Sequence, residues 1–214
     1  MDQALREPPG LLAAGGDLSP TRLLAAYERG VFPWYSAQQP ILWWSPDPRM
    51  VLFPDEFKLA RSLNKTLRNG AFTTQLDHAF ADTIRGCAAP RRSGPDTWLN
   101  AEMIRSYQEL HELGFGHSIE TYRGDELVGG VYGIQLGKVF FGESMFSLER
   151  DASKVAVARL VDECRARDIR VIDCQVASNH LASLGARDVS RSQFVALLRQ
   201  YCSRSPCGKW TSPV

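Results

Sequence analysis

The chain has 214 residues, of which 44% are apolar and 23% charged, a composition typical of a folded globular protein. Its formal net charge of +1 excludes a strongly basic molecule, so any contact with nucleic acid must come from a local basic patch. No run approaches the ~18 apolar residues of a membrane helix, and the charged N-terminus lacks the apolar stretch of a signal peptide. We therefore expect neither a membrane span nor a cleaved leader.

The five cysteines are an odd number and contain no Cys-x-x-Cys pair. This usage is typical of reduced thiols in a cytoplasmic protein rather than of a disulfide framework. The four histidines do not lie at metal-ligand spacing from the cysteines, so no metal is expected.

The first 50 residues are rich in glycine, proline and aromatic side chains. Ser19 as N-cap and Pro20 at the first helical position predict a short helix that ends at Gly30. Residues 32–35 and 42–49 are aromatic and proline-rich, which favours extended segments and turns. We predict a boundary near residue 50, giving a small N-terminal domain (1–50) and a larger domain (51–214).

The next part of the chain has helical periodicity, and helices are predicted over 54–69, 76–88 and 100–113. In the first of them, basic residues three or four apart would form a stripe on one side. The stripe consists of Lys58, Arg61, Lys65 and Arg68. It is a candidate surface for nucleic-acid phosphates, although such runs are also typical of a solvated helix face.

The period then changes to alternation, which predicts antiparallel strands over 117–122, 127–135 and 138–142. A helix over 153–167, a strand over 170–176 and a helix over 191–202 follow. This order predicts an α/β (α+β) fold with a mixed sheet and helices on both faces.

Two predicted strands carry polar residues where burial would be costly. Glu143 lies in a predicted Gly-Glu-Ser turn at the end of strand 138–142, and a buried carboxylate there is costly unless it binds something. Asp173 and Gln175 share one face of strand 170–176. The opposite face is formed by Ile172, Cys174 and Val176. The alternatives are a turn-capping acid for Glu143 and a structural strand-end acid for Asp173.

Many separate segments, spread over nearly the whole chain, resemble the bacterial leucyl/phenylalanyl-tRNA–protein transferases. The similar segments are 10–20 (GLLAAGGDLSP), 30–34 (GVFPW), 41–49 (ILWWSPDPR), 97–98 (TW), 117–120 (HSIE), 127–130 (LVGG), 140–147 (FFGESMFS), 152–154 (ASK), 173–175 (DCQ) and 180–186 (HLASLGA). The tail from Cys202 to Val214 does not align clearly with the family.

The resemblance implies a GNAT-type N-acetyltransferase-like fold for the C-terminal domain and an aminoacyltransferase activity. The implied reaction moves Leu or Phe, and Met less well, from Leu-tRNA, Phe-tRNA or Met-tRNA to a protein. The acceptor is the α-amine of a protein with N-terminal Arg or Lys, and the new N-terminal residue marks that protein for degradation under the N-end rule. No cofactor is implied, and we expect a monomer.

The resemblance also implies roles for individual residues. Asp173 and Gln175 match the positions proposed to handle the attacking amine, and Glu143 matches one that contacts the substrate. Apolar pocket candidates are Phe140, Met145 and Leu160, each of which could equally be plain core. Aromatic candidates near the 3′ adenosine of the tRNA are Trp43 and Trp98, with one of the pair Trp43 and Trp44 expected in the core.

Three other functions are alternatives to this one. An acyl-CoA N-acetyltransferase would hold pyrophosphate with a glycine-rich loop, but residues 149–154 (ERDASK) contain two acids and no glycine. A non-catalytic RNA-binding module would not need the costly polar strand with Asp173 and Gln175. A peptidoglycan-type aminoacyl-tRNA transferase is usually a longer chain.

Overall fold

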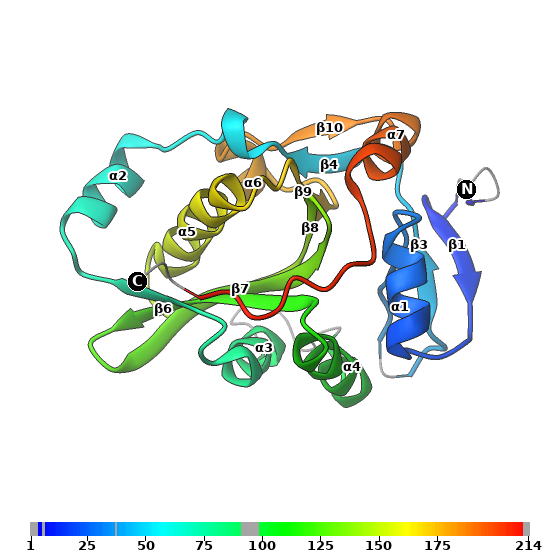
Figure 1. Ribbon diagram of the computed structural model, residues 1–214, viewed down its shortest axis with the longest axis horizontal. Coiled ribbons are helices and arrows are strands. Elements are labelled where there is room, and N and C mark those ends of the chain that lie inside the picture. Colours follow the sequence, from blue (N-terminus) through cyan, green and yellow to red (C-terminus); the bar gives the residue numbers. More distant parts are fainter. Residues whose placement is uncertain (1–3, 6, 37, 91–98, 212–214) are drawn as a thin grey trace.

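The computed structural model describes residues 4–5, 7–36, 38–90 and 99–211. Its centre is a seven-stranded mixed sheet (Figure 1). From one edge to the other the strands are β10 (Arg187–Val189), β4 (Arg49–Leu52), β9 (Val171–Gln175), β8 (Val139–Ser147), β7 (Glu126–Leu136), β6 (Gly116–Arg123) and β5 (Thr73–Leu76). All neighbours are antiparallel except β8 and β9, which are parallel. The predicted α/β fold with a mixed sheet is confirmed.

Helices cover both faces of this sheet. Helix α5 (Ala152–Ala166) packs on β6, β7 and β8, while α3 (Phe80–Ala88) and α4 (Ala101–Glu112) cover the other face (Figure 1). Helix α5 contains many alanines and valines, so its backbone comes close to the sheet and most of its residues are buried. The chain crosses from β8 to β9 through α5, as parallel neighbours require.

The N-terminal segment forms a second, three-stranded sheet in the order β1–β3–β2. Its elements are β1 (Leu11–Ala14), α1 (Pro20–Tyr27), β2 (Phe32–Pro33) and β3 (Leu42–Trp44). One continuous apolar core includes Tyr27 and Trp43 of this segment together with Phe141 and Val139 of the large sheet. The predicted boundary near residue 50 falls inside β4, a strand of the large sheet.

Two predicted helices differ in the structure. Residues 54–69 form a 3-10 turn, η1 (Pro54–Glu56), and a shorter helix, α2 (Arg61–Arg68). The chain is extended at Phe57, whose side chain packs against two apolar clusters, and the backbone N–H of Lys58 donates to Leu184. These tertiary contacts interrupt the helix that the local periodicity favours.

The predicted helix 76–88 begins later, at Phe80, because residues 73–76 form β5 and a bend at 77–79 separates the two elements. The two threonines of β5 pair with β6 at the sheet edge, where β-branched residues are favoured. Strands β6 and β7 and the helices at 101–112, 152–166 and 191–201 (α7, Arg191–Tyr201) agree with the predicted spans to within one residue, whereas β8 extends beyond its predicted end at residue 142. A short helix, α6 (Asn179–Ser183), was not predicted.

The predicted Gly-Glu-Ser turn is also wrong, because β8 continues through it to Ser147. Tyr132 of β7 pairs with Ser144 and Gly133 pairs with Gly142, so Glu143 is an extra residue on β8. A bulge of this kind bends the strand and re-aims a side chain. A Cβ on Gly133 would lie 2.2 Å from the Phe141 carbonyl oxygen, so the tight pairing beside the bulge requires glycine.

Candidate active site

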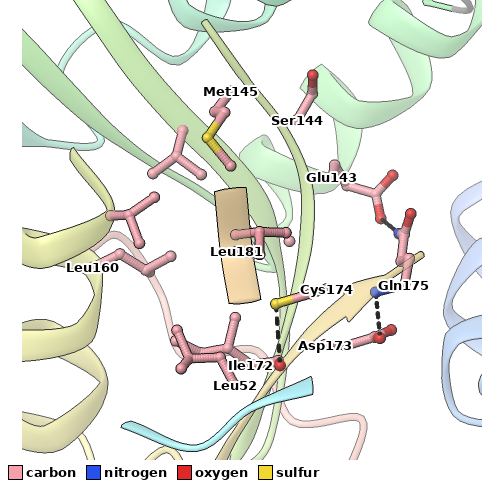
Figure 2. Close-up of a pocket in the computed structure, with 13 residues that line it drawn as sticks. Leu52, Glu143, Ser144, Met145, Leu160, Ile172, Asp173, Cys174, Gln175 and Leu181 are labelled. Carbon is pink, nitrogen blue, oxygen red and sulfur yellow. Dashed lines mark hydrogen bonds between the residues drawn. The ribbon is translucent and has the colours of Figure 1, made fainter. Parts of the chain in front are cut away.

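A pocket of about 100 Å³ opens between α5 and strands β8 and β9. Its wall is mostly apolar, and its polar groups gather at one end (Figure 2). The lining residues are Leu52, Val131, Gly142, Glu143, Ser144, Met145, Val157, Leu160, Ile172, Asp173, Cys174, Gln175 and Leu181. An apolar pocket with a few convergent polar groups is the usual form of a small-ligand site.

Glu143 is an acid of this site whose pKa is raised by burial. The bulge in β8 turns its side chain to the polar end of the pocket, where it is 8% exposed. Gln175 Nε2 donates to Glu143 Oε1 over 2.8 Å, and Tyr107 Oη donates to Oε2 over 2.7 Å. Burial raises the pKa of Glu143 from 4.5 to about 7, although the hydrogen bonds oppose this. The carboxyl group is therefore near half-ionised at neutral pH.

A chain of buried tyrosine hydroxyls extends from Glu143 to the N-terminal segment. The Tyr27 hydroxyl in α1 lies 2.8 Å from the Tyr107 hydroxyl in α4, which donates to Glu143. Burial and the nearby Glu143 carboxylate raise the pKa values of Tyr27 and Tyr107 well above normal, so both stay protonated. This role could not be predicted from the sequence, because Tyr27 also fits the apolar face of its helix.

Asp173 lies in the middle of β9 in a buried ion pair with Arg49. Arg49 Nε donates to Asp173 Oδ1 over 2.8 Å and Nη2 donates to Oδ2 over 2.6 Å, with both side chains at most 1% exposed. The Arg49 guanidinium also lies between the rings of Phe32 and Phe194, 4.7 and 4.8 Å from their centroids. Asp173 is thus held in place by a two-point contact, and Arg49 is a site residue that the sequence interpretation missed.

Gln175 connects these two carboxyl groups. Its φ of 63° is in the left-handed region, which is unfavourable for a residue with a side chain. In this conformation its backbone N–H donates to Asp173 Oδ1 over 2.9 Å while its side-chain amide reaches Glu143. In Figure 2 the side chains of Ile172 and Cys174 lie on the pocket side of β9. Val176, predicted to share their face, lies beyond β9 and is 45% exposed.

The predicted substrate-binding residues separate into three groups. Met145 and Leu160 line the pocket. Phe140 and Trp43 do not: Phe140 is 1% exposed and packs beside Trp210, and Trp43 is 6% exposed with its indole N–H donating to Gly15. In the tryptophan pair, Trp43 is therefore the core residue. Trp98 lies outside the described residues.

The predicted basic stripe is only partly on a helix. Arg61, Lys65 and Arg68 are exposed on α2, whereas Lys58 is exposed on the extended segment before it. A shallow hollow beside α2 includes Lys65 together with Arg123 and Arg150. The structure therefore adds to this surface Arg123 at the end of β6, which pairs with Glu149, and Arg150 from the β8–α5 connection.

The start of α5, where an acyl-CoA enzyme would hold pyrophosphate, is occupied by acidic groups. Asp151 is its N-cap residue and pairs with Lys154 Nζ over 2.9 Å. In the part of the chain that the structure describes, no three His, Cys, Asp or Glu side chains gather as a metal site would require. None of the described helices is both long and apolar enough to cross a membrane.

Comparison with known proteins gives consistent matches. The family model for leucyl/phenylalanyl-tRNA protein transferase matches residues 51–199, and the model for its N-terminal domain matches residues 16–47. The transferase of Cellvibrio japonicus is 55% identical over 91% of this chain and 83% of its own length. That of Aromatoleum aromaticum is 52% identical over 99% of this chain and 90% of its own length.

Solved structures with a similar arrangement are much more distant in sequence. L-PGS from Bacillus licheniformis is 11% identical, with a TM-score of 0.43 over 75% of this chain and 54% of that protein. A GCN5-related N-acetyltransferase from Kribbella flavida is also 11% identical, with a TM-score of 0.40 over 80% of this chain and 61% of that protein. The sequence matches, by contrast, extend over almost the whole chain, and they show that it belongs to the leucyl/phenylalanyl-tRNA–protein transferase family of aminoacyltransferases.

Proposed function

We propose that this enzyme moves Leu or Phe, and Met less well, from aminoacyl-tRNA to the α-amine of proteins with N-terminal Arg or Lys. The observation that carries the proposal is an apolar pocket that ends at Glu143, an acid whose pKa is about 7. The apolar wall suits the transferred side chain, and flexible Met145 suits both branched and aromatic guests. The polar end would receive the reacting ester and amine.

The chemistry needs little covalent help, because the aminoacyl ester is already activated. The acceptor nitrogen attacks the ester carbonyl, the bond to the ribose oxygen breaks, and the ribose leaves as a hydroxyl. Holding ester and amine together supplies ~7–11 kcal/mol of the barrier reduction. A general base adds ~10²–10⁴-fold by taking the proton that the amine loses.

We propose that Glu143, rather than Asp173, takes this proton from the amine and passes it to the leaving ribose oxygen. A base works best when its pKa is near the working pH, and Glu143 meets that condition. Asp173 already accepts two hydrogen bonds from Arg49 and one from Gln175. In this proposal Asp173 and Arg49 are positioning residues, which hold Gln175 so that its amide can orient the Glu143 carboxylate.

The proposal includes the cellular setting that the family resemblance implies. The enzyme would act as a monomer in the cytoplasm, and the added residue would mark the acceptor protein for N-end-rule degradation. The five cysteines are all free thiols, in keeping with a reducing compartment.

A transfer assay tests the proposed reaction. Purified protein is mixed with labelled Phe-tRNA and a peptide that begins with Arg, and in parallel with labelled acetyl-CoA and the same peptide. We expect label to enter the peptide from the tRNA alone, and to be lost when the first residue is Gly. Label from acetyl-CoA alone would contradict the reaction, and equal transfer to the Gly peptide would contradict the acceptor rule.

The basic surface beside α2 would contact tRNA phosphates, which are bound without reading sequence. Changing Lys65 and Arg68 to Glu should weaken tRNA binding and flatten its salt dependence, because fewer counterions are released. The measurement is the slope of log K against log salt concentration. Arg105→Glu, a charge reversal at an exposed position of α4, is the matched control and should change the slope less. Equal slopes in all variants would show that Lys65 and Arg68 do not contact the tRNA and are ordinary solvated surface residues.

A further inference from the structure

A second cluster of reactive groups lies outside the pocket, where the C-terminal segment crosses β5, β6 and β7. It contains Cys207 of that segment, His117 of β6 and Asp77, which follows β5. Cys207 Sγ lies 3.1 Å from His117 Nε2, and His117 Nδ1 lies 2.8 Å from Asp77 Oδ2. A nucleophile, a base and a group that orients the base, each in hydrogen-bond reach of the next, are the signature of an activated nucleophile.

The hydrogen bonds of Asp77 fix the tautomer of His117. Asp77 Oδ1 accepts from the Ser118 N–H over 2.8 Å, and Oδ2 accepts from the Trp210 N–H over 2.6 Å. A carboxylate held by two such donors can only accept from His117, so the imidazole proton is on Nδ1. The lone pair of Nε2 therefore faces Cys207, whose thiol can donate to it as well as to nearby oxygens.

The imidazole is held rigidly in this orientation. His117 is fully buried and stacks on the Trp210 ring, with centroids 4.6 Å apart and planes at 10°. Its titratable neighbours are Asp77, His111 of α4, Arg167 at the end of α5 and Cys207 itself. Burial lowers the pKa of His117, Asp77 opposes this, and His111 and Arg167 add smaller lowering contributions. The net shift is downward, so the ring is neutral and able to accept a proton at neutral pH.

The surroundings of the sulfur keep the resting group a thiol. Gln135 Oε1 lies 3.0 Å from Sγ and accepts the Trp210 indole N–H, while the Gly114 carbonyl oxygen lies 3.6 Å from Sγ. Acceptors around a sulfur disfavour the thiolate, and burial raises the pKa of Cys207. Its reactivity would therefore depend on proton transfer to His117 during attack, and not on a thiolate that is already present in the resting protein.

Cys207 differs from the other cysteines in exposure. Cys87 and Cys164 are buried and Cys174 and Cys202 are partly so, whereas Cys207 is exposed. Burial raises the pKa of Cys174 well above its ordinary value and that of Cys202 to about 12. Cys207 also contacts a histidine, His117, within hydrogen-bond distance.

We propose that Cys207 is a modification site that reacts with small disulfides, with His117 as the base. As Sγ attacks one sulfur of the disulfide, its proton passes to His117 Nε2 and the disulfide bond breaks. The leaving thiolate takes the proton from the imidazolium, so the products are a mixed disulfide on Cys207 and one free thiol. Asp77 stabilises the imidazolium during the exchange.

The test uses the unmodified full chain and the neutral probe bis(2-hydroxyethyl) disulfide. The rate of adduct formation is followed by mass spectrometry between pH 5.5 and 9, and the modified residue is identified in peptides. We expect the adduct on Cys207, at a rate that levels off above the pKa of His117, which is below its ordinary ~6.5. A rate that rises tenfold per pH unit up to pH 9, or a first adduct on Cys174 or Cys202, would overturn the proposal.

Variants give an independent test. His117→Gln should slow the adduct on the order of 10²-fold at pH 7, the lower range for loss of a general base. His111→Gln, which removes a neighbouring imidazole that does not touch the sulfur, is the matched control. Cys207→Ser should abolish the adduct and leave aminoacyl transfer unchanged. An unchanged rate in folded His117→Gln protein, or equal slowing by His111→Gln, would exclude His117 as the base.

Discussion

Replacing Glu143 with Gln is expected to lower the rate of aminoacyl transfer by ~10²–10⁴ while leaving the protein as stable as before, or more so. The rate falls because the amide cannot take a proton. The fold tolerates the change because Gln has the same shape and its oxygen can still accept a hydrogen bond in the buried position that Glu143 occupies. In the unmodified enzyme the rate should rise with pH through about 7, as Glu143 ionises.

The direction of the stability change follows from the raised pKa of Glu143. The unfolded chain releases this proton near 4.5, whereas the folded chain holds it until about 7. The stability that protonated Glu143 contributes is therefore fully present below about 4.5 and is lost as the pH rises through 7. The loss is about 3 kcal/mol at pH 8, and Gln, which has no charge, avoids it.

Chemical denaturation at pH 4.5 and pH 8 measures this effect, alongside transfer rates. Glu120→Gln is the matched control, because Glu120 is fully buried on β6 and its pKa is also raised by burial. Glu120 is not among the pocket-lining residues, so this variant should gain stability at pH 8 and keep its activity. A Glu143→Gln enzyme that transfers at the normal rate would exclude Glu143 as the base.

Replacing Asp173 with Ala is expected to destabilise the fold by ~3–5 kcal/mol, because it leaves the buried Arg49 charge without its partner. The double variant Arg49→Met/Asp173→Ala should lose less than the sum of the two single variants. The measurement is the free energy of unfolding in urea for all four proteins. Arg187→Met breaks an exposed ion pair with Glu56 and, as a control, should cost less than ~1 kcal/mol.

This expectation changes how activity data on Asp173 are interpreted. A low transfer rate in Asp173→Ala would reflect both lost protein and a displaced Gln175, so it does not by itself identify a base. Rates must be normalised to the folded fraction. A variant that is fully stable yet inactive would contradict the positioning role and favour Asp173 as the base.

The periodicity of the sequence correctly predicted those helices and strands that pack mainly against elements close to them in the chain. Strands β6 and β7 and helices α4, α5 and α7 have clear periodicity, and their spans were confirmed, whereas β8 continues past its predicted end at residue 142. The predicted single helix over 54–69 was wrong, because contacts of Phe57 and Lys58 with residues distant in the chain override the local helical pattern. Contacts of this kind do not appear in any short window of sequence.

The sequence allowed several residues of the candidate site to be predicted, but not how they are arranged in space. The sequence identified Glu143, Asp173 and Gln175 as polar residues whose burial would be costly, and the structure brings all three to one pocket. It could not reveal the bulge that aims Glu143, because that depends on pairing with β7. Nor could it reveal the partner of Asp173, since Arg49 lies 124 positions away in the chain.

The hydroxyl chain from Tyr27 to Glu143 has a practical consequence for anyone seeking a smaller enzyme. Two family models cover the chain, which invites removal of the first one as a separate module. A fragment starting at residue 50 would lack both Tyr27 and Arg49, and with them the outer end of the Glu143 network and the counterion of Asp173. The N-terminal segment thus supports both carboxyl groups of the candidate active site from outside the pocket, and we expect that a minimal transferase must retain it.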